Sequence, residues 1–122
     1  TSDDYTLKGT NIKWNPAIKT KQDRDALWDG LNSDLLDVIA SDHAPHAIEE
    51  KANKYRDAPS GGPLVQHSLP ALLTAFHQGK ITLEKIVEKA CHNPAILFDI
   101  KERGYIREGY FADLIFVQHQ RL

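Results

Sequence analysis

The segment Asp42-His43-Ala44-Pro45-His46 places one carboxylate and two imidazoles close together in the chain. It follows a nearly unbroken apolar run, residues 35–41, which predicts a strand buried on both faces. A carboxylate at the end of such a strand has three roles open to it: it can bind a metal ion, transfer a proton, or close the loop as an Asx turn. The two neighbouring histidines favour a chemical site, as expected for a metal-dependent α/β enzyme.

The chemistry expected of Asp42 depends on a divalent metal ion. Such an ion lowers the pKa of its bound water from above 15 to roughly 7–9. A carboxylate that touches metal and water can then accept the proton and pass it to a leaving group. His43 and His46 could be a metal pair, or each could be a packed or surface histidine. For His46, farther into the loop, we expect a hydrogen bond to a substrate carboxylate or carbonyl.

The elements ahead of this segment are expected to be a short strand and a helix. Asn11 to Trp14 could form the strand. Thr20 is a good N-cap, and Asp23 three residues later can complete a capping pair, so a helix is expected over residues 21–32. The helix and the strand over residues 35–41 together begin an α/β pattern.

Helices are also expected to follow the segment. Ser68 can cap a helix whose apolar residues repeat at helical spacing and which Gly79 ends, and Thr82 can cap another. Asn93-Pro94 would end that helix and begin a short one, and residues 112–117 read as a last strand. The long connection over residues 43–66 is expected to be functional, because loops of this length are uncommon in compact domains.

Composition excludes several classes of partner. The 122 residues have a formal net charge of −2, so neither nucleic acid nor an anionic membrane surface would be attracted overall. No apolar stretch approaches the roughly 20 residues needed to cross a bilayer. The single Cys91 cannot form an internal disulfide, which favours the cytoplasm. The chain opens on Thr1 and contains no Met, from which we expect a piece of a longer polypeptide.

Four segments in order resemble dihydroorotases of the amidohydrolase superfamily. The Asp42–His46 segment followed by Glu49-Glu50-Lys51 resembles their signature. Residues 13–19, ahead of Asp23-Arg24, resemble their Asn-Pro-Pro-Leu-Arg segment. Residues 58–70 resemble their glycine-containing substrate loop, and residues 104–113 resemble the return to a small β domain. The match covers nearly the whole chain.

This resemblance implies a fold, a reaction and a metal. The fold would be α/β, with residues 1–101 as the C-terminal part of a metal-dependent (β/α)8 barrel and residues 102–122 as the start of a small β-sandwich. The reaction would be reversible hydrolysis of the cyclic amide of dihydroorotate to N-carbamoyl-aspartate, in de novo pyrimidine biosynthesis. Zinc would be the cofactor, with one or two ions per full-length subunit. We expect a small-molecule substrate and a homo-oligomer, such as a dimer.

The resemblance also implies roles for individual residues. Asp42 would be the metal ligand of the last barrel strand and the general acid and base. Asn15 and His46 would bind the substrate, His46 through the substrate carboxylate. Backbone groups around Ser60 and Gly61 would hold the edge of the pyrimidine ring, although an ordinary glycine turn is an alternative there. Glu49, Glu50 and Lys51 are expected to form a solvated loop face.

Two departures from the family pattern bear on activity. Lys19 stands where the family has an arginine, which keeps the charge but loses the bidentate fork. The family's early His-x-His pair, its metal-bridging side chain and its two mid-barrel histidines have no counterpart in this sequence. We therefore expect the chain alone to be inactive and to bind zinc weakly. The remaining histidines are expected to be surface or packing residues: His67, His77, His92 and His119.

Three alternatives stay open at this point. Another cyclic amidohydrolase, such as a hydantoinase or allantoinase, would share the fold and the acidic ligand but would not be expected to have Asn15 and His46 together. A non-catalytic dihydroorotase-like subunit would serve as a scaffold for a partner enzyme. A stand-alone interaction module would need other surfaces to cover the faces of the buried strand.

Overall fold

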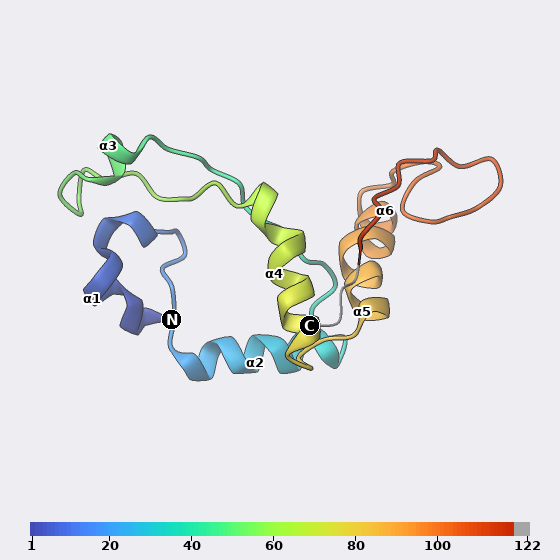
Figure 1. Cartoon of the computed structure of the whole chain (residues 1–122), viewed down its shortest axis with the longest axis horizontal. Helices are drawn as coiled ribbons and strands as arrows, with labels where there is room; N and C mark the ends of the chain where they lie inside the picture. The colour runs from blue at the N-terminus through green and yellow to red at the C-terminus, as the bar shows by residue number, and fades with distance from the viewer. Residues whose placement is uncertain (119–122) are drawn as a thin grey trace.

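The computed structural model describes residues 1–118; residues 119–122, which include His119 and the end of the expected 102–122 unit, lie outside the described part. The described chain forms an open arc of short helices joined by long connections (Figure 1). The elements are, in order, η1 (Ser2–Asp4), α1 (Tyr5–Lys8), η2 (Gly9–Ile12), α2 (Lys21–Asn32), α3 (Ile48–Lys51), α4 (Val65–His77), α5 (Leu83–Val87), η3 (Glu88–His92) and α6 (Asn93–Leu97).

Helix α2 has the bounds that its capping residues predict. The Thr20 hydroxyl accepts a hydrogen bond from the Asp23 amide at 3.3 Å, and the Asp23 carboxylate accepts one from the Thr20 amide at 3.0 Å. This reciprocal pair satisfies two backbone donors that the first helical turn would leave unpaired. The prediction of a helix over residues 21–32 is confirmed.

Helix α4 begins earlier than predicted. It starts at Val65, so Ser68 lies inside the first turn, where its hydroxyl donates to the Leu64 carbonyl at 3.0 Å instead of capping. The prediction of Ser68 as the cap is therefore wrong. Pro70 lies within the helix, and Gly79 follows its end with a φ of +69°, a conformation that glycine adopts at little cost.

The segment from α5 to α6 is one continuous helical path. Thr82 caps it as predicted, through a bond from the Lys85 amide to its hydroxyl at 3.1 Å. The predicted short helix beginning at Asn93-Pro94 is confirmed as α6, but no break precedes it, because the π-helical turn η3 ends at His92, directly ahead of Asn93. A π turn changes which carbonyl faces each amide, and this accommodates a proline that lacks an N–H.

The core is small and lies where α2, α4 and α5 meet (Figure 1). Its buried members are Leu31, Ala75, Ile81 and Ile86, and Trp28, Ile39, Leu72 and Phe76 pack against them. Large apolar side chains elsewhere are left open, including Leu35 at 80%, Ile106 at 89% and Phe116 at 94% exposure. Within residues 1–118, no helix has both the length and the apolar character needed to cross a membrane.

The structure differs from the sequence prediction at the expected strands. Residues 35–41 and 112–117 form no strand in the described part, and residues 11–12 belong to η2. A strand needs a neighbour to accept its backbone hydrogen bonds. Residues 1–118 supply only one such pairing, an isolated parallel bridge between His43 and Gly62. The division at residue 101 and the β-sandwich tail stay predictions.

Candidate functional site

Asp42 lies at the end of the extended segment with its carboxylate uncommitted. Its backbone has a φ of +46°, in the left-handed region that aspartate tolerates better than most residues. The residue is exposed, and within residues 1–118 no hydrogen bond or ion pair joins its side chain to another group. Both carboxylate oxygens are therefore available to an external ligand, so an Asx-turn role has no support in this geometry.

His43 fixes the register between the Asp42 segment and helix α4. It forms the parallel bridge with Gly62, and the Ala44 amide donates to the Gly62 carbonyl at 3.1 Å. The His43 Nδ1 atom accepts a hydrogen bond from the Val65 amide at 3.2 Å, at the first turn of α4. An accepting Nδ1 requires the proton on Nε2 in the neutral ring. His43 thus caps a helix, a role that sequence reasoning missed because the residues are 22 apart.

His46 meets the loop that was predicted to bind substrate. Its Nε2 atom lies 3.1 Å from the Ser60 carbonyl oxygen, and since a carbonyl only accepts, Nε2 carries the proton. Its Nδ1 atom lies 3.9 Å from a Glu50 carboxylate oxygen, which also accepts from the Ala47 amide at 2.9 Å. The structure therefore brings His46 and Ser60 together, although they are 14 residues apart.

Gly61 is required by close packing. Its φ is +121°, and a β-carbon at this position would lie 2.6 Å from the Ala44 β-carbon and 2.7 Å from the Ala44 carbonyl oxygen. Its amide donates to the Lys13 carbonyl at 3.0 Å, so this N–H is already used. Within the described chain, the Ser60 N–H and hydroxyl take part in no hydrogen bond, and they stay available to a ligand.

Asn15 lies on the neighbouring segment, exposed and directly after Trp14. The Trp14 indole packs beside Gly62, where an added β-carbon would lie 3.1 Å from the indole Nε1 atom. In the described part of the chain, that Nε1 is buried and has no hydrogen-bond partner. No hydrogen bond in residues 1–118 links the Asn15 side chain to Asp42 or His46, so Asn15 is brought near the loop only through its neighbours Lys13 and Trp14.

Lys51 corrects the prediction of a solvated loop face. Glu49 and Glu50 are exposed as expected, but Lys51 is only 5% exposed. Its ammonium donates to the carbonyls of Lys13, Pro59 and Gly61 at 2.9–3.0 Å. A charged residue in a polar stretch carries no sequence signal of burial, which is why sequence reasoning missed it. Burial, followed by the charge of Lys13, lowers the pKa of Lys51.

The donors for a metal ion are incomplete within the described chain. No group of three or more His, Cys, Asp or Glu side chains converges in residues 1–118. Asp42 fits one ligand position, because its carboxylate is exposed and unpaired and because hard or borderline divalent cations accept oxygen donors. His43 offers only Nε2, since its Nδ1 caps α4.

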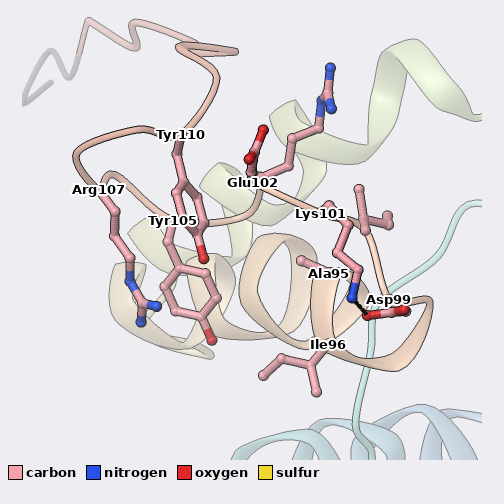
Figure 2. Close-up of a pocket in the computed structure, with 10 residues that line it drawn as sticks. Ala95, Ile96, Asp99, Lys101, Glu102, Tyr105, Arg107 and Tyr110 are labelled. Atoms are coloured by element: carbon pink, nitrogen blue, oxygen red, sulfur yellow. Dashed lines mark hydrogen bonds and ion pairs between the residues drawn. The ribbon is translucent and has the colours of Figure 1, made fainter.

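A separate hollow of about 310 Å³ lies beside α6 and the turn-rich tail (Figure 2). Its wall carries the Arg107 guanidinium 4.2 Å from the centre of the Tyr105 ring, and that ring stacks on His92 at 4.1 Å. It contains none of the residues predicted for the site. The chemical site and this hollow are therefore distinct.

Comparisons with known proteins agree with the motif order. Residues 9–120 match the family described as the amidohydrolase family. A dihydroorotase from Halobacterium salinarum is 41% identical over 115 residues, which is 94% of this chain and 27% of that protein. A dihydroorotase from Clostridioides difficile is 39% identical over 116 residues, again 94% of this chain and 27% of that protein. The chain spans about a quarter of the length of these curated relatives.

Solved structures of hydantoinases match the fold of this chain. The L-hydantoinase (dihydropyrimidinase) from Arthrobacter aurescens superposes with a TM-score of 0.85 at 32% identity, covering 92% of this chain and 26% of that one. The D-hydantoinase from a Bacillus species, AR9, gives a TM-score of 0.79 at 29% identity, covering 88% of this chain and 25% of that one. The described backbone thus follows the corresponding quarter of these enzymes, although the expected strands over residues 35–41 and 112–117 do not form.

Proposed function

Because this chain belongs to the amidohydrolase family, we propose that it is part of a dihydroorotase. That enzyme would interconvert dihydroorotate and N-carbamoyl-aspartate in de novo pyrimidine biosynthesis. The observation that carries the proposal is the identity of 41% and 39% to two dihydroorotases over 94% of the chain. Its partner would be this small-molecule substrate, and the whole enzyme would be a cytoplasmic homo-oligomer.

The proposed chemistry centres on Asp42. Zinc, when bound by Asp42 and by ligands from the rest of the enzyme, would supply a Lewis acid and acidify the attacking water. The Asp42 carboxylate oxygen that does not hold the metal would accept the proton of that water. It would then donate the proton to the ring nitrogen as the amide C–N bond breaks. In the reverse direction the same carboxylate would take the proton from the carbamoyl nitrogen before ring closure.

The proposed substrate contacts come from two segments. His46 would bind the substrate carboxylate through an Nδ1–H of the charged ring, because Nε2 already donates to the Ser60 carbonyl and Nδ1 is the ring nitrogen left to donate. Asn15 would contribute its amide from the neighbouring segment. The unused N–H and hydroxyl of Ser60 would face the ring edge. The Gly61 amide is already bound to Lys13, so we assign Gly61 the role of letting the loop pass Ala44.

The proposed architecture follows from the resemblance and from the likeness to hydantoinases. Residues 1–101 would belong to a (β/α)8 barrel and residues 102–122 to a β-sandwich. The exposed Leu35 and Ile106 would then be covered by other parts of the enzyme. Since no group of three or more His, Cys, Asp or Glu side chains converges within the described residues, the chain by itself would not catalyse the reaction.

A hydantoinase is the second candidate, favoured by the TM-score of 0.85 to an L-hydantoinase. The two candidates differ in substrate charge, because dihydroorotate carries a carboxylate and hydantoin does not. The test is kcat/KM of the enzyme that contains this chain, measured for dihydroorotate and for hydantoin. We expect dihydroorotate to be preferred. Preference for hydantoin would support the second candidate, and hydrolysis of neither would support a non-catalytic scaffold.

A further inference from the structure

Lys51 is a buried cation in a connection that is otherwise exposed. It ends the short helix α3 and is 5% exposed, although the residues on both sides of it are open to solvent. Burying an ammonium is costly unless every N–H finds an acceptor. A buried lysine therefore needs acceptors at fixed positions, and the residues that supply them show which segments the lysine joins.

The three acceptors come from two segments far apart in sequence. The Lys51 Nζ atom lies 3.0 Å from the Lys13 carbonyl, 2.9 Å from that of Pro59 and 3.0 Å from that of Gly61. An ammonium has three donors and no acceptor, so its hydrogen-bonding capacity is used completely. Lys51 thus joins the segment that leads to Asn15 to the loop that contains Ser60.

Lys13 completes the link from the other side. Its ammonium donates to the Tyr55 and Ala58 carbonyls, both at 2.6 Å, and lies 4.8 Å from the centre of the Tyr55 ring. The Gly61 amide donates to the Lys13 carbonyl at 3.0 Å. The two lysines therefore bind each other's segments through backbone carbonyls. This set of contacts is called the lysine clamp below.

The clamp contains no acidic partner. Within residues 1–118, neither Lys13 nor Lys51 forms an ion pair with a carboxylate, and every contact that holds their ammonium groups is a carbonyl or a ring. A pair of cations held by carbonyls is a poor choice for stability alone, because apolar side chains of similar size would avoid the desolvation cost. The arrangement instead fixes where the carbonyls of residues 59–61 point.

We propose that Lys51 is a positioning residue for substrate binding, holding the loop of residues 59–61 against the segment of residues 13–15. The loop contains Ser60, whose carbonyl accepts a hydrogen bond from His46. The segment of residues 13–15 contains Asn15. The inference rests on the proposed dihydroorotase function and adds to it the residue that keeps its substrate contacts in register. Lys51 itself touches no substrate in this account.

The test compares Lys51→Met with Lys54→Met in the enzyme that contains this chain. Lys54 is an exposed lysine of the same connection whose side chain forms no hydrogen bond or ion pair within residues 1–118, so it controls for lost charge. Lys51→Met should raise KM for dihydroorotate about tenfold, because three carbonyls lose their donor, while kcat changes little. Hydrogen exchange of the ligand-free enzyme should speed up in peptides that cover residues 59–62. Lys54→Met should change neither the KM nor the rate of hydrogen exchange in these peptides.

Lys51→Arg serves if Lys51→Met does not fold, since it keeps the charge and several donors in a wider fork. Its KM should rise with kcat retained. Unchanged KM would overturn the proposal, as would a loss of kcat and thermal stability at constant KM, which is the signature of a structural role. If the unaltered enzyme does not hydrolyse dihydroorotate, the proposed function fails, and unchanged exchange at residues 59–62 would then overturn the clamp independently.

Discussion

Gly61 lies so close to Ala44 that a β-carbon on Gly61 would stand 2.6 Å from the Ala44 β-carbon and 2.7 Å from its carbonyl oxygen. The two residues belong to extended segments that run side by side next to the His43–Gly62 bridge (Figure 1). This contact brings the loop of residues 59–61 directly onto the Asp42–His46 segment. The loop of residues 59–61 and the Asp42–His46 segment therefore cannot move independently.

Gly61→Ala should destabilise the enzyme and weaken substrate binding. The φ of +121° is strained for any side chain, and the clashing atoms of Ala44 are its β-carbon and its backbone carbonyl, not the end of a flexible side chain. We expect a loss on the order of 3 kcal/mol in the free energy of unfolding, combining backbone strain with overpacking, measured by denaturant titration. Gly79→Ala is the matched control, since its φ is +69° with nothing within 4 Å, and it should cost only about 1 kcal/mol. An equal loss in the free energy of unfolding for the two variants would contradict the close contact between Gly61 and Ala44.

His46→Ala should act mainly on KM. The ring donates from Nε2 to the Ser60 carbonyl, and the charged ring would donate from Nδ1 to the substrate carboxylate, so its loss removes a proposed substrate contact and loosens the loop. We expect KM for dihydroorotate to rise about tenfold, the cost of one hydrogen bond to a charged group. His67→Ala, an exposed histidine of α4, should leave KM unchanged. A fall in kcat without any change in KM would show that His46 does not bind substrate.

How much of this could be predicted from sequence depended on where the determining contacts lie. The bounds of α2 were predicted correctly because Thr20 and Asp23 are three residues apart and cap locally. The start of α4 was not, because part of its cap is His43, 22 residues away from Val65. Strands over residues 35–41 and 112–117 failed for a related reason, since strand pairing needs partners that residues 1–118 do not supply.

The candidate site shows the same division, and the roles proposed for its residues stay predictions. Asp42 and His46 stood out because acidic and imidazole groups after an apolar run are uncommon. Lys51 did not, because nothing in the sequence Glu49-Glu50-Lys51 distinguishes a solvated lysine from one that binds three carbonyls. The contribution of long-range backbone contacts became visible only in three dimensions.

Acid should weaken the junction of α2 and α5 through Asp34. Hydrogen bonds from Lys85 at 2.6 Å and from Lys89 at 2.8 Å lower the pKa of Asp34 from 3.8 to about 2. Folding therefore lowers this pKa, so the unfolded chain binds more protons in that interval. The stability that Asp34 contributes is complete above about pH 4 and is lost as the pH falls towards about 2.

The variant Asp34→Asn tests this in the enzyme that contains the chain. Its melting temperature should lie below that of the unaltered enzyme at neutral pH, and the gap should narrow as the pH falls below about 4. Asp29→Asn is the control, because the Asp29 carboxylate makes no ion pair within residues 1–118. A gap that stays constant with pH would show that the Asp34 carboxylate is not what stabilises Lys85 and Lys89.

The most direct test of the account is kcat for dihydroorotate in the enzyme that contains this chain, measured side by side with its Asp42→Asn variant. Asparagine keeps the size of the side chain but cannot accept and return the proton. We predict that the unaltered enzyme hydrolyses dihydroorotate and that Asp42→Asn lowers kcat by about a thousandfold or more, within the range for a general acid and base. A near-normal kcat in the variant would contradict the role assigned to Asp42.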